Sequence, residues 1–404
     1  MKERLIFHVD VNSAFVSWES AKRVANGQSD LRLVPAIVGG NPADRGSVVL
    51  AKSVPAKKYN IVTGEPVAMA IRKCPNLIIA LPDFHTYSAY SRAFKDILRE
   101  YAPKLQEFSI DECFLDMTGT ELIYPDPIKT ATEIKDRIKN ELGFTVNVGI
   151  GNNKFCAKMA SDFEKPDKVH TLFMDEIEKK LWPLPVGDML FCGKATSERL
   201  NRAGIRTIGD IAKNDMQYLK SVVGEKGAIS LYESAWGRDD SPVEEEWGDA
   251  MSHSMVTTPE EDIVGYDHGE AILMGLCESV AMRLRRDKAR AYCISVNIRY
   301  TDFRNKSHQR SLERATDITG EIYTNARDLL TEMWNGKDHL RLMGVALSQL
   351  TRDDAEQMSL FDLGNENRER QRKLDRTMDE IRNRFGMDSI KRGAAADVRG
   401  HKGK

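Results

Sequence analysis

Apolar and polar residues alternate along the chain in a way that predicts short strands separated by helices. The continuous apolar run at 5–9 and the strict alternation at 292–300 are typical of strands, whereas repeats of three to four residues predict helices. The predicted strands cover residues 5–11, 35–40, 47–51, 108–117, 145–150, 292–300, 311–315 and 341–350. The predicted helices cover residues 13–24, 87–101, 126–142, 153–163, 270–286 and 319–333. Because these elements alternate without a repeating unit, the pattern predicts an α+β fold with mixed or antiparallel sheets.

Breaks in the pattern divide the chain into regions. Pro183 and Pro185 end a first α+β region, and a small helical region, 188–237, follows. A polar, acidic linker at 239–258 leads to a second α+β region, and the chain becomes polar again from Asp353 onward. A chain of 404 residues is long enough for two to four such domains.

Composition narrows the class of protein. The hydrophobic content is 41% and no stretch approaches the ~20 apolar residues of a membrane span. The N-terminus lacks the apolar core of a secretory signal, and the six cysteines are scattered without a CxxC motif or zinc spacing. These features predict a cytoplasmic protein with reduced thiols and no contact with a membrane.

Charge is distributed unevenly along the chain. The formal net charge is −2, which by itself does not indicate a nucleic-acid-binding protein. Residues 283–314, however, are strongly basic, and a local basic patch matters more for phosphate contact than the total charge. The candidate DNA-binding residues of this stretch are Arg283, Arg285, Arg299, Arg304 and Arg310.

Three acids stand beside two predicted strands that are about a hundred residues apart in sequence. Asp10 ends the first strand, and Asp111 and Glu112 adjoin the apolar run 113–115. Three carboxylates at one point would repel one another unless a cation lay between them, and hard oxygen ligands select Mg²⁺ or Mn²⁺. Two such ions are the apparatus for in-line displacement at phosphorus. Taken singly, each acid could equally be a turn or capping residue; together they predict a catalytic metal site, which both adjacent acids could reach only at a turn or bulge.

Other residues could serve a nucleotide at that site. Lys52 and Lys57, with Lys58, follow a predicted strand, and Lys165 follows a predicted helix that also carries Lys154 and Lys158. Such lysines could neutralise charge on a leaving pyrophosphate or could simply form a solvated basic face. The ring of Phe15 could exclude a 2′-hydroxyl beneath a nucleotide sugar, or it could be a core residue.

Two further segments indicate contacts with other macromolecules. Residues 193–205, which begin with Gly193 and Lys194, resemble half of a helix-hairpin-helix, in which backbone N–H groups hold a phosphate; helical packing would explain the pattern equally well. Gln357, Leu360 and Phe361 lie in the polar tail, where exposed apolar residues are typical of a short anchor for a partner. The alternative is that this segment packs on its own domain.

The chain contains the motifs HVDVNSAF at 8–15, AKKY at 56–59, SIDECFLD at 109–116 and VGIGNNKFCAK at 148–158. With these motifs it resembles the Y-family DNA polymerases of the bacterial DNA polymerase IV (DinB) branch over essentially its whole length. The SIDE block is the most specific of these motifs. The resemblance implies a right-hand polymerase with a ferredoxin-like palm (1–11 and 77–170), small fingers (12–76), a helical thumb with a helix-hairpin-helix (171–240) and an α+β little finger (241–352). Residues 353–404 would form a C-terminal tail with a clamp-binding motif.

The resemblance also implies residue roles. Asp10, Asp111 and Glu112, with the carbonyl of Val11, would bind two Mg²⁺ ions, or Mn²⁺ in their place, and the three acids would be the catalytic residues. Phe15 would be the steric gate and Lys165 would contact the triphosphate. Gln357, Leu360 and Phe361 would bind the bacterial sliding clamp, and the protein would act as a monomer.

This chain departs from the family pattern at three places. Val54-Pro55-Ala56-Lys57 replaces the usual Tyr-Glu-Ala-Arg, Asn12 stands where an acid is common, and Phe191 replaces the first glycine of the thumb hairpin. The tyrosine and arginine that hold a triphosphate in the fingers are therefore absent, and lysine does not offer the bidentate fork of arginine.

The sequence therefore predicts a template-directed, low-fidelity translesion DNA polymerase that adds deoxynucleotides from an incoming dNTP to a primer 3′-hydroxyl on primer-template DNA, without proofreading. Two other classes stay open. A nucleotidyl cyclase shares a palm-like sheet and metal-binding acids but has no use for a helix-hairpin-helix or a basic C-terminal domain. A catalytically inactive DNA-binding scaffold would not need all three acids.

Overall fold

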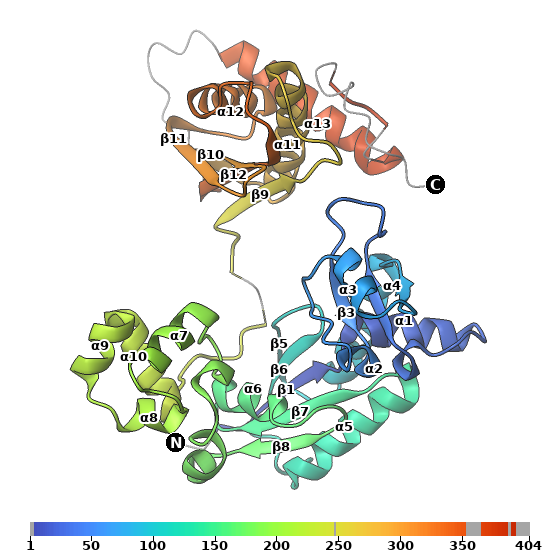
Figure 1. Cartoon of the computed structure of the whole chain (residues 1–404), viewed down its shortest axis with the longest axis vertical. Helices are drawn as coiled ribbons and strands as arrows, with labels where there is room; N and C mark the ends of the chain where they lie inside the picture. Colours follow the sequence, from blue (N-terminus) through green and yellow to red (C-terminus); the bar gives the residue numbers. More distant parts are fainter. Residues whose placement is uncertain (1–3, 246–247, 353–364, 387–388, 393–404) are drawn as a thin grey trace. The chain divides into compact units, whose positions relative to one another are not determined.

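A computed structural model of the chain describes residues 4–245, 248–352, 365–386 and 389–392. The chain forms two compact units, Met1–Trp247 and Gly248–Lys404, and each is described by itself (Figure 1). Among the residues described, no helix is long and apolar enough to cross a membrane.

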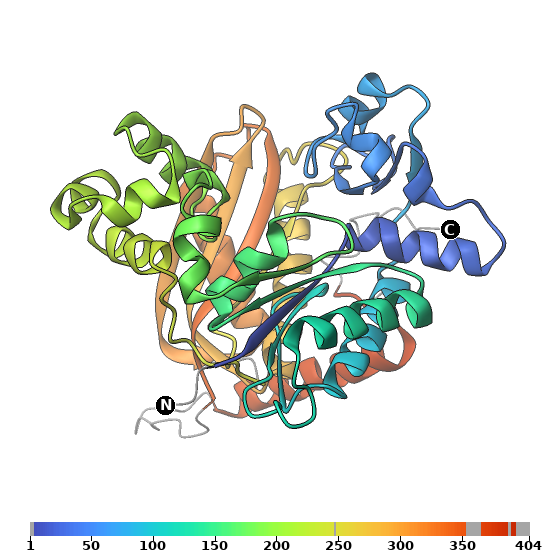
Figure 2. The ribbon, with the colours of Figure 1, turned by 90° about the horizontal axis from the view of Figure 1, so that it is seen from below.

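The first unit is built on a five-stranded sheet with the order β5-β6-β1-β7-β8. Its strands are β1 (Ile6–Val11), β5 (Lys104–Glu107), β6 (Glu112–Asp116), β7 (Val146–Gly151) and β8 (Val169–Leu172). The helices packed on it are α1 (Ala14–Ala25), α4 (Phe84–Arg99), α5 (Pro127–Leu142) and α6 (Lys154–Asp162). β1 lies at the centre and pairs antiparallel with both β6 and β7, so its backbone is held on both sides. In the view from below, α5 runs along this sheet (Figure 2).

The two faces of the sheet differ because side chains alternate along each strand. Phe7, Val9 and Val11 of β1 are buried in the main core with α1, α4 and α5. Ile6, His8 and Asp10 point to the opposite face, where α6 contacts β7 and β1. The polar members of β1 are therefore directed toward α6.

Two smaller parts complete the first unit. A three-stranded sheet with the order β3-β2-β4 carries two short helices, and a separate core lies between them. These elements are β2 (Ala36–Gly39), β3 (Val49–Lys52), β4 (Ile78–Ala80), α2 (Val54–Lys57) and α3 (Val67–Lys73). A helical part has its own core. It contains α7 (Lys194–Arg202), α8 (Ile208–Lys213), α9 (Met216–Val223) and α10 (Glu225–Ala235).

The second unit is a four-stranded antiparallel sheet in the order β11-β10-β12-β9, with helices packed on one face. Its strands are β9 (Ser252–Thr257), β10 (Arg290–Tyr300), β11 (Asn305–Thr316) and β12 (Leu340–Thr351). Its helices are α11 (Tyr266–Arg286), α12 (Thr319–Met333) and α13 (Asn365–Phe385). Two of these elements were not predicted from the sequence: β9 lies in the predicted linker, and α13 lies in the predicted tail.

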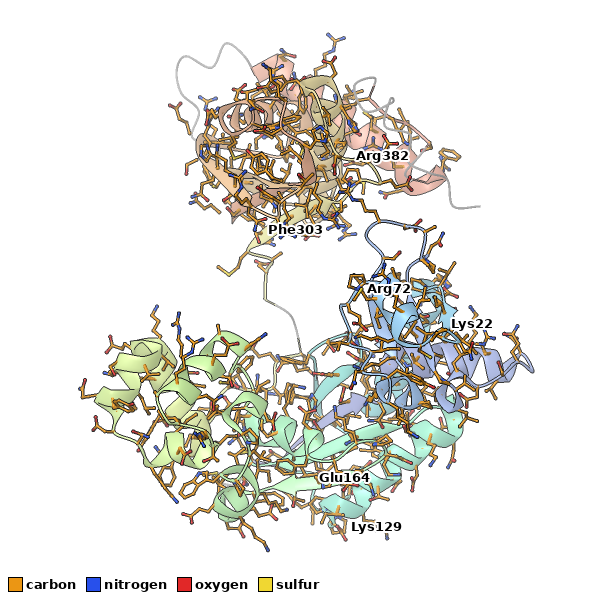
Figure 3. The ribbon with its side chains drawn as sticks, in the orientation of Figure 1. Lys22, Arg72, Lys129, Glu164, Phe303 and Arg382 are labelled. Carbon is orange, nitrogen blue, oxygen red and sulfur yellow. The ribbon has the colours of Figure 1, made fainter. Side chains whose placement is uncertain are left out.

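α13 is held on the second unit by charges more than by apolar contacts. Its Arg382 is 2.9 Å from Glu278 of α11, and both side chains are less than a tenth exposed (Figure 3). Arg285 of α11 contacts Asp375 and Asp379 of α13 at 3.4 and 2.7 Å. Such ion pairs leave no trace in a hydrophobicity pattern, which explains why the helix was not predicted.

Candidate active site

The register of the central sheet brings Asp10 and Glu112 together. Asp10, near the end of β1, is paired with Glu112 at the start of β6 and with Asn147 on β7. Directly opposed residues of an antiparallel pair point to the same face, so both carboxylates are directed toward α6. The Asp10 side chain is 7% exposed and that of Glu112 is 20% exposed.

Asp111 lies next to this pair, in the turn before β6. The amides of Phe108 and Ser109 both donate to the Glu112 carbonyl, which closes the turn. The Ser109 hydroxyl donates to Asp111 Oδ1 at 2.5 Å, and the Val11 amide donates to the Asp111 carbonyl at 3.0 Å. The end of β1 and the turn that carries Asp111 are thus hydrogen-bonded to each other.

Two ammonium groups contact the paired carboxylates. Lys165 Nζ donates to Asp10 Oδ2, and Lys158 Nζ lies 2.9 Å from Glu112 Oε2. Burial raises the pKa of Asp10 to about 6, against the opposing effect of Lys165. Burial also disfavours the Glu112 carboxylate, but its contacts with His8 and Lys158 outweigh burial and lower the pKa of Glu112 to about 2. Burial likewise opposes the charge on Lys165, but the nearby acids outweigh it and raise the Lys165 pKa above its usual range.

Two glycines of β7 allow α6 to approach closely enough to place Lys158. A Cβ at Gly149 would lie 2.0 Å from the Ala157 carbonyl oxygen, and one at Gly151 would lie 2.7 Å from Cys156 Cβ. Any larger residue would push the helix outward. The sequence analysis noted these residues only as part of a family motif; the structure gives them a packing role.

Two asparagines position the loop that carries Lys165. Asn147 Nδ2 donates to the carbonyls of Ser161 and Glu164, and Asn147 Oδ1 accepts from the Lys168 amide. Asn12 Oδ1 accepts from the Asp167 amide at 3.0 Å. Asn12, which departs from the family pattern, therefore fixes the loop that follows α6.

His8 is a site residue that sequence reasoning missed. Its side chain is fully buried, Nδ1 is 2.8 Å from Ser161 Oγ, and Nε2 is 3.5 Å from Glu112 Oε2. Burial lowers the pKa of His8 to about 4, so the imidazole is neutral near pH 7. A signal was present, since a polar residue two positions before Asp10 in an otherwise apolar strand must face the same side as Asp10.

Within the ranges described, no group of three His, Cys, Asp or Glu side chains is arranged tightly enough to hold a metal ion. The structure brings Asp10 and Glu112 together, with Asp111 beside them, and two lysines supply the positive charge. The donor atoms available here are carboxylate and carbonyl oxygens, which suit a hard divalent cation.

Phe15 and two of the candidate triphosphate lysines lie in other parts of the first unit. The half-buried Phe15 ring is stacked on Tyr87 at a centroid distance of 5.1 Å, with Phe84 edge-on at 5.9 Å. Lys57 is exposed on α2, whereas Lys52 Nζ donates to the Ile61 carbonyl at 2.6 Å. Burial and Lys57 lower the pKa of Lys52.

The helical part keeps the predicted turn before α7. Gly193 is the N-cap of α7, and both Gly193 and Lys194 are exposed. Phe191, which stands at a family glycine position, adopts φ 66° and is 77% exposed. This backbone conformation favours glycine, so Phe191 is strained at this position of the hairpin.

Two of the predicted DNA-binding arginines contact acids of their own domain. The Arg285 side chain is 7% exposed and is held by Asp375 and Asp379. Arg310 contacts Asp328 and Glu332 of α12 at 3.4 and 2.6 Å, so it points to the helical face. A count of charges along the chain could not reveal that these two arginines pack against acids of other helices.

The other three arginines lie closer to solvent. Arg299 Nε donates to Asn305 Oδ1, and Arg304 at the β10–β11 turn is 77% exposed beside Asp302. Arg283, near the C-terminal end of α11, is half-buried, and its Nη1 donates to the Ser254 carbonyl at 3.3 Å. Phe303, in the turn between β10 and β11, is 61% exposed (Figure 3).

The face of the β9–β12 sheet opposite the helices is small and polar. The pairing registers align Ser295, Gln309, Ala346 and Ser254 in one row across the sheet. A second row contains Asn297, Ser307, Gly344 and Val256, and a third contains Cys293, Ser311, Ser348 and Ser252. The sequence analysis did not single out this face. The proposed clamp residues Gln357, Leu360 and Phe361 lie outside the residues that the structure describes.

Comparison with known proteins gives three family matches. Residues 9–162 match the impB/mucB/samB family, residues 250–360 match the C-terminal domain of that family, and residues 192–239 match the thumb domain of DNA polymerase-iota. Among solved structures, a chimera of the Y-family DNA polymerases Dbh and Dpo4 has a TM-score of 0.76 at 22% identity, covering 86% of this chain and 100% of that chain. This likeness confirms the predicted α+β polymerase fold.

Curated relatives match along nearly the whole chain. DNA polymerase IV of Clostridium acetobutylicum is 44% identical, with 96% of this chain and 97% of that protein covered. DNA polymerase IV 2 of Bacillus subtilis is 36% identical, with 99% and 96% covered. These matches favour the polymerase over the cyclase and the inactive scaffold. The chain belongs to the Y-family DNA polymerases, in the bacterial DNA polymerase IV branch, and is a DNA-directed DNA polymerase of the translesion type.

Proposed function

We propose that this polymerase extends a primer by two-metal-ion nucleotidyl transfer, with Asp10, Asp111 and Glu112 as the catalytic metal ligands. The observation that carries the proposal is the register of β1 and β6, which sets Asp10 opposite Glu112 with Asp111 in the adjoining turn. Mg²⁺ is the proposed ion, and Mn²⁺ its substitute, because every donor is an oxygen. The Val11 carbonyl is the proposed backbone donor. When bound, the ions would polarise the primer hydroxyl and offset charge on the triphosphate.

The protein's own cations would complete the site. Lys165, Lys57 and Lys52 are the proposed triphosphate contacts, and they would stabilise the charge that develops on pyrophosphate. Lys57 is exposed, whereas Lys52 must first leave the Ile61 carbonyl. With no tyrosine at Val54, which is 52% exposed, these lysines carry the contacts that the family's fingers usually make.

Phe15 is the proposed steric gate. Its ring is fixed by stacking on Tyr87 and by the edge-on contact with Phe84. A ring held on two sides cannot turn away from a 2′-hydroxyl, so it would select deoxyribose by exclusion.

The structural elements suit the four proposed domains. The five-stranded sheet would be the palm, β2–β4 with α2 and α3 the fingers, α7–α10 the thumb, and the β9–β12 sheet with its helices the little finger. Among the described residues 4–245 and 248–352, these assignments leave no segment for an exonuclease domain, and we propose synthesis without proofreading. Gly193 and Lys194 would hold DNA phosphates in the thumb.

The small polar face of the β9–β12 sheet would lie against DNA in the little finger. Ser, Asn and Gln side chains can donate to phosphate oxygens, and small residues allow the backbone to approach. Arg299, Arg304 and Arg283 at its margins would add charge. Arg285 and Arg310 were also predicted to bind DNA, and each would first have to leave the acids that it contacts. The clamp contact through Gln357, Leu360 and Phe361, the cytoplasmic location and the monomeric state stay predictions.

Primer extension tests the proposal. Asp111→Ala and Glu112→Ala should abolish extension of a labelled primer with Mg²⁺ and dNTPs, while their affinity for primer-template DNA stays within a few-fold of wild type. Glu164→Ala is the matched control, because Glu164 is an exposed acid in the loop after α6 whose side chain lies 3.6 Å from Lys168. If either acid variant still extends the primer at the control's rate, the metal-ligand assignment is wrong.

A further inference from the structure

A lysine ammonium group contacts each of the two paired carboxylates that we propose as metal ligands. Lys165 Nζ contacts Asp10 and also lies 2.8 Å from Asp162 Oδ1. Lys158 Nζ contacts Glu112. A carboxylate oxygen that accepts from an ammonium is not free to bind a metal ion at the same lone pair. Before any ion binds, the negative charges of Asp10 and Glu112 are therefore balanced by these two lysines.

The two lysines differ in their freedom to leave. The Lys158 side chain is 10% exposed and lies within α6, which the glycines of β7 hold tightly to the sheet. The Lys165 side chain is 36% exposed and belongs to the loop after α6. The loop backbone is fixed at Glu164, Asp167 and Lys168 by Asn147 and Asn12. Only the side chain of Lys165, with its flexible stem, is therefore placed to move.

We propose that Lys165 is a positioning residue that exchanges between two anions: it occupies Asp10 in the free enzyme and turns to the triphosphate when a nucleotide binds, which opens Asp10 to the cation. This inference rests on the proposed function, since it takes Asp10 as a metal ligand and Lys165 as a triphosphate contact. The new element is that Lys165 cannot contact Asp10 and the triphosphate at the same time.

Exclusive use of one ammonium makes metal and nucleotide binding interdependent. A nucleotide that removes Lys165 from Asp10 favours the cation there, and a cation at Asp10 frees Lys165 for the nucleotide. Coupling of this kind is reciprocal, so it can be measured from either side. It would also keep the site from binding a divalent ion tightly before a nucleotide arrives.

The first measurement is Mn²⁺ binding, followed by electron paramagnetic resonance, to the enzyme on primer-template DNA with no nucleotide. Lys165→Met should bind Mn²⁺ about tenfold more tightly than wild type, because the competing ammonium is gone. Lys168→Met is the matched control: it removes the same charge from the same loop, but its side chain faces Glu164 at 3.6 Å. The control should bind Mn²⁺ as the wild type does.

The second measurement takes the other side of the coupling and needs no Lys165 variant. With the metal chelated, dNTP binding is measured for Asp10→Asn and Glu112→Gln. Both variants remove one negative charge from the pocket, but only Asp10→Asn removes a carboxylate that holds Lys165, which then keeps its partly exposed contact with Asp162. Asp10→Asn should bind the nucleotide at least about fivefold more tightly than Glu112→Gln.

The results separate this inference from the function on which it rests. If Lys165→Met and Lys168→Met bind Mn²⁺ equally, or if Asp10→Asn and Glu112→Gln bind the nucleotide equally, the exchange is refuted while the metal site can stand. If, with a nucleotide bound, Asp10→Asn leaves Mn²⁺ binding unchanged, Asp10 is not a metal ligand, and both the proposed metal site and the exchange fail.

Discussion

Replacing Gly149 by alanine should move α6 away from the sheet and disable the site without touching a charged residue. The new Cβ would lie 2.0 Å from the Ala157 oxygen, 2.3 Å from the Ser161 nitrogen and 3.0 Å from the Ala160 carbonyl carbon. All three are backbone atoms of α6, so no side-chain rotation can relieve the overlap. The oxygen and nitrogen are four residues apart, the spacing of one α-helical hydrogen bond.

The size of the effect follows from these distances. Ordinary contact begins at 3.4 Å, so the helix must shift by about 1.4 Å or distort. Overpacking destabilises the fold by about 1–3 kcal/mol, and a disrupted buried hydrogen bond by a similar amount. Alanine also makes the unfolded chain less flexible than glycine does, which stabilises the fold by about 0.4–1 kcal/mol. We expect a net loss of about 2–4 kcal/mol, or about 5–15 °C in Tm for a unit of this size.

Activity should fall with the same shift. Lys158 Nζ is 2.9 Å from Glu112 Oε2, and an outward shift of α6 by more than 1 Å breaks this contact and carries the Lys165 loop with it. Misplacement on this scale lowers rates about 100-fold. Single-nucleotide incorporation at saturating DNA measures this, and calorimetry measures the unfolding of the first unit.

Alanine variants of two other glycines serve as references for this experiment. Gly46→Ala, where a Cβ meets nothing within 4 Å, should unfold as the wild type does. Gly151→Ala, whose closest approach is 2.7 Å, should fall between the two. If Gly149→Ala matches Gly46→Ala in both Tm and incorporation rate, close packing of α6 does not position the site.

Three further predictions concern other parts of the chain. Phe15→Ala should raise incorporation of ribonucleotides at least about tenfold relative to deoxynucleotides, whereas Val54→Ala should not; unchanged sugar discrimination would remove Phe15 from the gate. Glu278→Gln should destabilise the second unit by about 3–5 kcal/mol in urea unfolding, because it removes the buried carboxylate that balances the charge of Arg382; a change below 1 kcal/mol would contradict this. Alanine at Gln357, Leu360 and Phe361 should abolish stimulation by a sliding clamp and spare distributive synthesis, and equal loss of both would reject a tethering role.

The sequence predicted the parts of the fold that hydrophobic periodicity governs. The helix at 319–333 has the predicted bounds, and the strands that carry Asp10 and Glu112 were found because apolar runs adjoin them. The strand predicted to start at residue 108 starts at Glu112, since residues 108–111 form the turn. The pairing of Asp10 with Glu112 could only be guessed, because register depends on contacts between distant residues.

Interactions between polar groups explain most of what the sequence did not reveal. The position of Lys165 on Asp10 depends on the side-chain oxygens of Asn12 and Asn147, which accept from backbone amides of the loop and which no periodicity encodes. The role of Arg310 depends on which face of β11 it occupies. α13 binds through ion pairs, with Met378 among its few buried apolar residues.

The manner in which α13 is attached decides how the C-terminal segment can be studied. A stop codon placed after β12 would remove the proposed clamp residues, but it would also strip Asp375, Asp379 and Arg382 from their partners. Glu278 and Arg285 would then face water with their charges uncompensated, and loss of processivity could reflect a damaged domain as much as a missing tether. Shortened proteins are therefore unsuitable reagents for mapping this end of the enzyme, and point replacements are the informative ones.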